Sequence, residues 1–233
     1  MEFFYPIGEN PENDPFLNGL PNGYKFAACI FYPFVKMQND WKSEDDTYPT
    51  NEDLLRFGKP LSWEEIRKDS GLNNISEMSI AVTAAAVLAD GYFGRKIYQR
   101  PDLAKKLDES LTENILYPMM DQISVFLIHR ILSVLASKGA KSIKYATLYG
   151  EQGTHEIKDL NLETINLLCD DIITISDENE ELVFTCYFDE VQALFFAKED
   201  YREVLVRNGL EGIIFDKKTP LVWEGSDDYV LLK

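Results

Sequence analysis

The chain has no lysine or arginine between Lys158 and Lys198, a stretch of 39 residues. Ten carboxylates lie in this stretch: Asp159, Glu163, Asp170, Asp171, Asp177, Glu178, Glu180, Glu181, Asp189 and Glu190. A segment of this kind projects a negative field that salt, a metal or a basic partner would offset. Acids also outnumber bases in the whole chain, 40 to 23, for a net charge of −17. That charge disfavours binding to nucleic acid or to an anionic membrane.

Cysteine and histidine are both scarce. The three cysteines, Cys29, Cys169 and Cys186, are odd in number, far apart and set in apolar runs, which predicts buried, reduced thiols and a cytoplasmic location. The two histidines, His129 and His155, are not spaced with any cysteine as zinc ligands would be. We also expect neither a signal peptide at the start of the chain nor a membrane-spanning helix.

Motifs that would announce catalysis are missing as well. The sequence contains no G-x-S-x-G, no phosphate-binding loop and no dinucleotide fingerprint. Asp177, Asn179 and Glu181 match the first positions of a calcium loop, but Leu182 stands where glycine is needed and Phe188 where the bidentate glutamate is needed. We therefore predict no metal and no cofactor.

The first half of the chain reads as mostly helical. Thr50 with Asp53 and Ser62 with Glu65 predict the starts of two short helices. Further helices are expected at 76–90, after Pro101, and at 119–137, where apolar residues surround nearly the whole cylinder except for a stripe containing His129 and Arg130. A helix of that kind belongs in a core, and a core role for His129 is favoured over a catalytic one.

After Gly139 the pattern changes to strands. Ser142–Tyr149 with Thr154–Lys158 predicts one hairpin, and Ile172–Ser176 with Leu182–Phe188 predicts another around an acidic turn. Further strands are expected at Val191–Ala197 and Gly212–Phe215, with short helices at Leu162–Cys169 and Glu199–Asn208. An early buried strand at Lys25–Val35 is expected to join this sheet. The segregation predicts a single α+β domain over residues 1–233, with a helical part at about 50–138 packed on a mostly antiparallel sheet from about 140–233.

Several segments resemble a family of uncharacterised proteins of Gram-positive bacilli, a domain of unknown function. They are Phe31–Val35, Tyr48–Glu52, Leu61–Glu65, Leu135–Ala140 and Ser176–Asn179. The resemblance implies a bacterial cytoplasmic protein and supplies no activity and no catalytic residues. The acidic strand–turn–strand followed by an amphipathic helix is also similar to acidic immunity proteins that neutralise toxins.

We predict a non-catalytic, acidic, cytoplasmic protein that is a binding protein or inhibitor-like, with a basic protein as its partner. The candidate binding residues are Asp170, Asp171, Asp177, Glu178, Glu180, Glu181, Asp189 and Glu190. Amide substitutions in the turn at 177–181 are expected to slow association and leave folding intact. Two alternatives stay open: an enzyme whose site uses His129, Arg130 or a cysteine, and a structural homo-oligomer. Lys138, Lys141 and Lys144 could form a basic face, or pair with the acidic half within one chain or between subunits.

Overall fold

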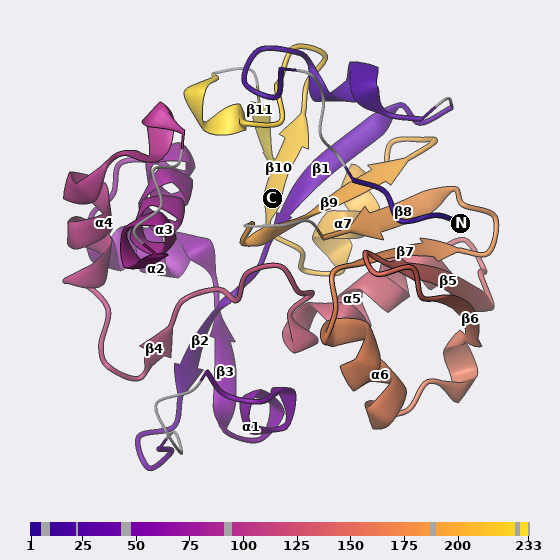
Figure 1. Cartoon of the computed structure of the whole chain (residues 1–233), viewed down its shortest axis with the longest axis horizontal. Helices are drawn as coiled ribbons and strands as arrows, with labels where there is room; N and C mark the ends of the chain where they lie inside the picture. The colour runs from indigo at the N-terminus through magenta and orange to yellow at the C-terminus, as the bar shows by residue number, and fades with distance from the viewer. Residues whose placement is uncertain are drawn as a thin grey trace. The chain divides into compact units, whose positions relative to one another are not determined.

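The computed structural model describes residues 1–5, 10–21, 23–42, 48–90, 95–186, 190–226 and 229–232, with the backbone alone at 87–90 (Figure 1). By its internal contacts the chain divides into two compact units, Met1–Tyr32 with Met119–Lys233, and Pro33–Pro118. Both helices and strands are present in each unit, so the protein is of the mixed α+β class. The prediction of a single domain stays a prediction.

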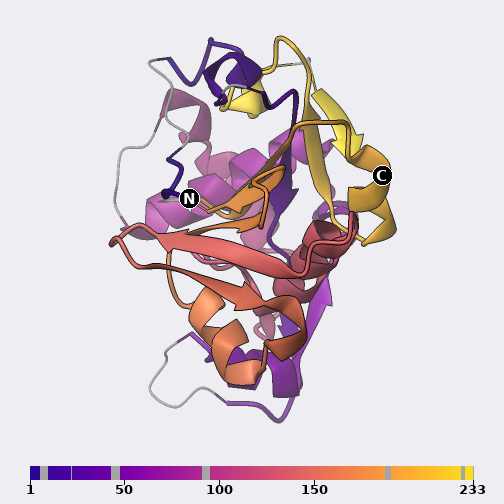
Figure 2. The same cartoon turned by 90° about the vertical axis from the view of Figure 1, so that its right-hand side faces the viewer.

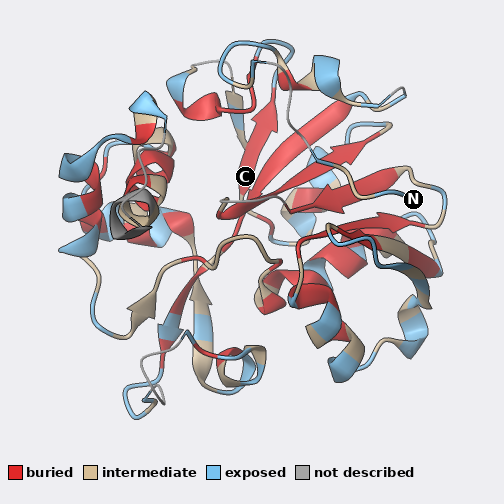
Figure 3. Cartoon of the chain, in the orientation of Figure 1, coloured by how far each residue is buried: buried red, intermediate tan, exposed pale blue. Residues whose placement is uncertain are grey.

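The larger unit is built on an eight-stranded sheet with the order β11-β10-β1-β9-β8-β7-β5-β6. The strands are β1 (Phe26–Phe31), β5 (Ser142–Thr147), β6 (Gln152–Glu156), β7 (Ile173–Asp177), β8 (Leu182–Thr185), β9 (Gln192–Ala197), β10 (Gly212–Phe215) and β11 (Tyr229–Leu232). Every pairing is antiparallel, as the sequence predicted for most of the sheet. Figure 3 shows that the inner strands are buried, whereas the edge strand β6 is largely exposed.

The helices of this unit are α5 (Val125–Ala136), α6 (Leu162–Cys169) and α7 (Arg202–Arg207), and the short 3-10 turns are η1 (Phe16–Gly19), η3 (Ile157–Asp159) and η4 (Trp223–Gly225). The apolar helix α5 packs against β7 and β8, and Figures 1 and 2 both place α6 near the β5–β7 end of the sheet. The predicted start of α5 at 119 was six residues too early. Ser124 caps the helix by accepting a hydrogen bond from the Phe126 N–H, and Asp121 has a positive φ of 68° that a helix does not allow.

The two faces of the sheet differ in polarity because side chains alternate along each strand. Ile175, Phe184 and Phe195 are aligned in register across β7, β8 and β9 and are fully buried. They share a face with Asp177 and Leu182, which lie near Leu135 of α5. The opposite face carries Thr174, Ser176, Val183, Thr185 and Phe196, and the N-terminal segment crosses it. One face is therefore an apolar helix-packing surface and the other is mixed.

The smaller unit combines helices with a sheet of order β3-β2-β4 that the sequence did not predict. Its elements are β2 (Phe34–Met37), α1 (Asn51–Phe57), β3 (Gly58–Leu61), α2 (Trp63–Ser70), α3 (Ile75–Asp90), η2 (Lys96–Tyr98), α4 (Pro101–Asp108) and β4 (Ile115–Leu116). The predicted capping box of Ser62 with Glu65 is present, and the predicted cap Thr50 forms a second capping box with Asp53. The four predicted helices of this region are confirmed in position to within a few residues.

The predicted strand at Lys25–Val35 is in fact two strands. Phe26–Phe31 joins the large sheet as predicted, whereas Phe34 begins β2 of the small one. Pro33 lies at the break because proline has no N–H to donate to a strand ladder. Packing of the helical region onto the large sheet stays a prediction.

Gly212 gives a stability test of the sheet. A Cβ atom added to Gly212 would lie 1.9 Å from the backbone oxygen of Cys29 on the neighbouring strand. We expect Gly212→Ala to lower the free energy of unfolding by about 3 kcal/mol, at the upper end of overpacking costs. Chemical denaturation measures this. Gly19→Ala is the matched control, because nothing lies within 4 Å of a Cβ atom added there. An equal loss of stability in both variants would contradict the close approach of Gly212 to the backbone of Cys29.

Candidate binding site

The acidic turn joining β7 to β8 is built around the carboxylate of Asp177. The side chain is buried, and its Oδ1 accepts hydrogen bonds from the N–H groups of Glu181 and Leu182, both at 2.7 Å. Its Oδ2 accepts from the Asn179 N–H at 3.1 Å. The Asp177 oxygens are therefore directed at the backbone of the turn.

Glu178 ties this turn to the start of β5. Its Oε2 accepts hydrogen bonds from the backbone N–H of Lys141 at 3.1 Å, the N–H of Ser142 at 3.0 Å and the Ser142 hydroxyl at 3.1 Å. These hydrogen bonds lower the pKa of Glu178 below its usual value. Glu178 is thus a structural contact between two strands of the sheet.

Glu180 is the carboxylate of the turn that meets cations. Its Oε1 lies 2.9 Å from the Lys144 ammonium and 3.6 Å from the amino group of Met1. The hydrogen bond from Lys144 is the main cause of its lowered pKa. Glu180 also has a positive φ of 54°, rare for a residue other than glycine. The ion pair of Lys144 with Glu180 shows that one of the three lysines after α5 pairs with the cation-free stretch within the same chain.

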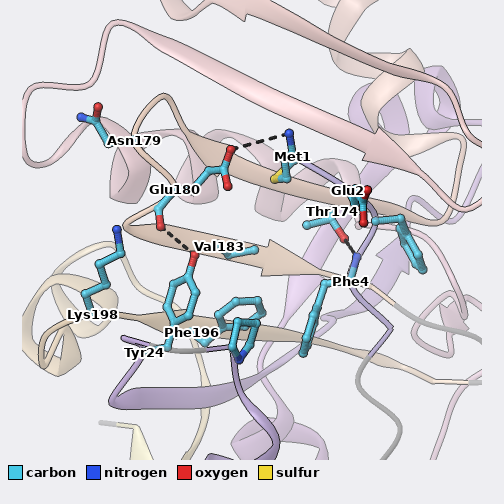
Figure 4. Close-up of a pocket in the computed structure, with 12 residues that line it drawn as sticks. Met1, Glu2, Phe4, Tyr24, Thr174, Asn179, Glu180, Val183, Phe196 and Lys198 are labelled. Atoms are coloured by element: carbon cyan, nitrogen blue, oxygen red, sulfur yellow. Dashed lines mark hydrogen bonds and ion pairs between the residues drawn. The ribbon is translucent and has the colours of Figure 1, made fainter.

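A pocket of about 470 Å³ opens beside Glu180 on the mixed face of the sheet (Figure 4). Its walls come from the N-terminal segment, the loop before β1, the acidic turn and strands β7, β8 and β9. The lining residues are Met1, Glu2, Phe3, Phe4, Pro21, Tyr24, Thr174, Asn179, Glu180, Val183, Phe196 and Lys198. A volume of this size suits a small molecule or a few residues of a peptide.

Aromatic rings form the floor of this pocket. The ring of Phe196 contacts Phe4 and Tyr24, with centroid distances of 4.8 Å in both pairs, and meets Tyr24 edge to face. The Tyr24 hydroxyl donates a hydrogen bond to the backbone oxygen of Glu180 at 2.6 Å. Burial, with the nearby charges of Glu180 and Asp177, raises the pKa of Tyr24 to about 12. Tyr24 therefore lines the pocket with a hydroxyl that is protonated near neutral pH and held in place by its hydrogen bond.

The eight predicted binding residues do not gather in one place. Asp177, Glu178, Glu180 and Glu181 belong to the turn, and of these only Glu180 lines the pocket. Asp171 precedes the other end of β7, roughly 20 Å along the strand at 3.3 Å per residue. Its Oδ1 accepts from the Ile172 N–H, and the Asp170 backbone oxygen accepts from the Gln122 side chain. The cation-free stretch is thus divided between opposite ends of one hairpin.

Of the two remaining candidates, Glu190 lies just before β9. Its side chain accepts a hydrogen bond from the Gln192 amide at 3.4 Å, and its backbone oxygen accepts from the Asp121 N–H. Asp189 lies outside the described residues. The binding role of these candidates stays a prediction.

The sequence reading missed the N-terminal segment and the two threonines beneath it. The Phe4 N–H donates to Thr174 Oγ1 at 3.0 Å, and the Thr185 hydroxyl donates to the Phe4 oxygen at 2.9 Å. An aromatic run before Pro6 was the available signal, since aromatic side chains at a chain end favour docking on a surface.

The residues of the enzyme alternative are placed as follows. His129 and Arg130 are exposed on α5, so the core role expected for His129 was wrong. The three cysteines are buried and free, as predicted. Burial raises the thiol pKa of all three, to about 12 for Cys169 and for Cys186. These thiols are protonated near neutral pH, which is the opposite of an activated nucleophile.

Comparison with known proteins supplies a family. Residues 12–225 match the family described as "Protein of unknown function (DUF2711)". The chain belongs to this family. It is also 28% identical, over 221 residues, to "Uncharacterized protein YwbB" of Bacillus subtilis (strain 168), with 91% of this chain and 96% of that protein covered. The predicted resemblance to an uncharacterised family of Gram-positive bacilli is confirmed. No solved structure matches the chain.

The description of the family states no activity. Among the described residues, no helix combines the length and the apolar character needed to cross a bilayer.

The hydrogen bonds of Asp177 revise one expectation. We now expect Asp177→Asn to destabilise the protein by about 1–3 kcal/mol, because an amide nitrogen cannot accept the backbone hydrogen bonds of a buried turn. Equilibrium denaturation measures the effect. The matched control is Glu181→Gln, whose side chain is half-buried beside the same turn. If Asp177→Asn unfolds at the same denaturation midpoint as wild type, the prediction from the sequence holds, namely that amides in this turn leave folding intact.

The lowered pKa of Glu178 predicts that the protein loses part of its folding stability in acid. Its folded-state pKa is lowered, so the stabilisation that it provides is present above its unfolded pKa of about 4.3 and is lost as pH falls through the lower, folded pKa. Glu178→Gln should therefore flatten the stability profile below about pH 5. Thermal melts of wild type and Glu178→Gln from pH 3 to 7 test this. The difference in stability between the two should shrink as the pH falls, and a difference that grows toward acid would contradict the prediction.

Proposed function

We propose that the protein acts by binding, and that Glu180 at the pocket of Figure 4 receives a cationic group of a basic partner protein. The observation that carries this proposal is the Lys144 ammonium, which lies 2.9 Å from the Glu180 carboxylate. An ammonium therefore fits beside this carboxylate. The net charge of −17 supports attraction of a basic partner at long range.

The titratable groups of the pocket support binding over catalysis. A general acid or base works best with a pKa near the operating pH. Tyr24 has its pKa raised to about 12, and Glu180 has its pKa lowered by its ion pairs. One group therefore stays protonated and the other stays ionised near neutral pH. Groups with fixed protonation states supply a binding partner with complementary charge and shape.

Of the candidate binding residues in the turn, Asp177 and Glu178 have a structural role in this proposal. Asp177 and Glu178 hold the turn through backbone hydrogen bonds, so they position Glu180 and do not offer their charge to a partner. A cytoplasmic location remains part of the proposal, because three reduced thiols suit a reducing compartment. The enzyme and homo-oligomer alternatives, and the packing of the helical half on the sheet, stay predictions.

A charge-neutral substitution tests the proposal. We expect Glu180→Gln to weaken binding of an N-acetylated pentalysine peptide about fivefold, a loss of about 1 kcal/mol for a partly exposed charge pair. Glu181→Gln removes the same charge from the same turn and should change the affinity less than twofold. Fluorescence anisotropy at low and high salt measures both.

Equal losses for the two variants would show that only the general acidic field attracts the peptide, and would refute the role of Glu180. Binding by wild type that does not weaken with salt would refute the electrostatic basis, because exposed charge attraction falls with ionic strength. An affinity pull-down from the native cell, with wild type and Glu180→Gln compared, would then identify the partner.

A further inference from the structure

The strand β6 forms one edge of the eight-stranded sheet, as Figure 1 shows. It pairs with β5, and within the described part of the chain no strand lies on its other side. The side chains of Gln152, Thr154 and Glu156 are exposed along this strand. An edge of this kind presents a row of backbone N–H and C=O groups with which another strand can pair.

The hydrogen bonds at the two ends of the β5–β6 hairpin show which backbone groups of β6 point outward. The Thr147 N–H donates to the Glu151 oxygen at 2.7 Å, and the Ile157 N–H donates to the Lys141 oxygen at 2.8 Å. In an antiparallel pair, every second residue is hydrogen-bonded to the partner strand. The odd-numbered residues of β6 therefore bond to β5. The outward backbone groups belong to the even-numbered residues, Gln152, Thr154 and Glu156.

These outward groups are self-complementary about Thr154. If a second copy of β6 runs antiparallel to the first with the two Thr154 residues opposite one another, each Gln152 lies opposite the Glu156 of the other copy. Every outward N–H then meets an outward C=O. The side chains match as well, because an amide can donate to a carboxylate and no like charges lie opposite each other.

A glycine and a tyrosine shape the other face of this edge. The ring of Tyr145 lies over Gly153, where an added Cβ atom would be 2.7 Å from the ring, and it stacks on His155 at a centroid distance of 5.3 Å. In the register about Thr154, Gly153 lies opposite the His155 of the second copy. The tyrosine ring that covers Gly153 is thereby brought next to that imidazole. A glycine in a strand commonly marks a place where another backbone approaches closely.

The distribution of charge favours a second copy of the chain as the partner at this edge. Residues 138–158 contain four lysines and two glutamates, so the hairpin and its flanks are net positive in a chain with a net charge of −17. Two acidic copies repel each other least when they meet through this region. Each basic hairpin is also attracted by the acidic remainder of the other copy.

We propose that two copies of this chain associate through β6, antiparallel about Thr154, and join their sheets into one continuous sheet. The interface is formed mainly by backbone hydrogen bonds, with the paired Gln152 and Glu156 side chains on one face and the Tyr145 and His155 rings on the other. The proposal is independent of the binding role of Glu180, which lies on the turn between β7 and β8 and not on β6.

Sedimentation velocity of the full chain tests the association. The 26.8-kDa wild type should form a reversible dimer whose fraction rises with protein concentration between about 1 µM and 1 mM, the range of dissociation constants of weak complexes. Thr154→Pro removes the outward N–H at the centre of the interface, and an edge strand tolerates proline where its N–H faces solvent. This variant should dimerise at least tenfold more weakly. Thr154→Val is the matched control, because it keeps the N–H, and should change the dissociation constant less than threefold.

Two charge variants test the register without proline. Thr154→Lys and Thr154→Glu each place like charges opposite one another at the two-fold axis, so each variant alone should be monomeric. An equimolar mixture should regain the dimer, because a lysine then lies opposite a glutamate.

A wild type that stays monomeric up to about 1 mM would overturn the inference. Thr154→Pro with a native circular dichroism spectrum that dimerises as well as Thr154→Val would overturn it too. Dimers of either charge variant alone, or a mixture that stays monomeric, would refute the register about Thr154. Glu180→Gln should leave the dimer unchanged, so failure of this inference is distinguishable from failure of the proposed function.

Discussion

The turn between β7 and β8 depends on a single buried carboxylate. The carboxylate of Asp177 accepts hydrogen bonds from three backbone N–H groups of the turn, those of Asn179, Glu181 and Leu182. That geometry holds Glu180 at a positive φ, with its backbone oxygen toward Tyr24 and its carboxylate toward Lys144 and Met1. The strain of a left-handed residue, about 1 kcal/mol, is offset by these contacts. Asp177 is thus the residue through which the fold positions the candidate site.

The sheet serves two purposes because its faces are chemically different. The face toward α5 is apolar along β7, β8 and β9, and it forms the core of the larger unit. The opposite face carries threonines and a serine among the apolar residues, so it can form hydrogen bonds with whatever covers it. The N-terminal segment is the cover that the structure shows. Substitutions at Phe184 or Phe195 therefore act on the apolar core, whereas substitutions at Thr174 act on the hydrogen bond that holds the N-terminal segment on the outer face.

Local signals in the sequence were sufficient for most elements of the fold. The capping boxes at Thr50 and Ser62, and the helix at Leu162–Cys169, could be predicted because their determinants lie within a few residues. The small sheet could not. Its strand β4 is two residues long, and β3 contains Pro60, so neither carries the alternation that predicts a strand. The start of α5 was missed for a related reason: an apolar run does not show where the backbone leaves the helix.

The candidate site was visible in the sequence only in part. The acidic turn stood out as charge, but the use of each carboxylate depends on partners distant in sequence. Glu178 accepts hydrogen bonds from residues 36 and 37 positions away, and the Phe4 N–H donates to a threonine 170 positions away. The cations missing from the stretch after Lys158 are supplied by strand pairing, since β5 brings Lys144 beside the turn. Glu180, which lies in a stretch of sequence without cations, is therefore paired in the fold with a lysine of the adjacent strand β5.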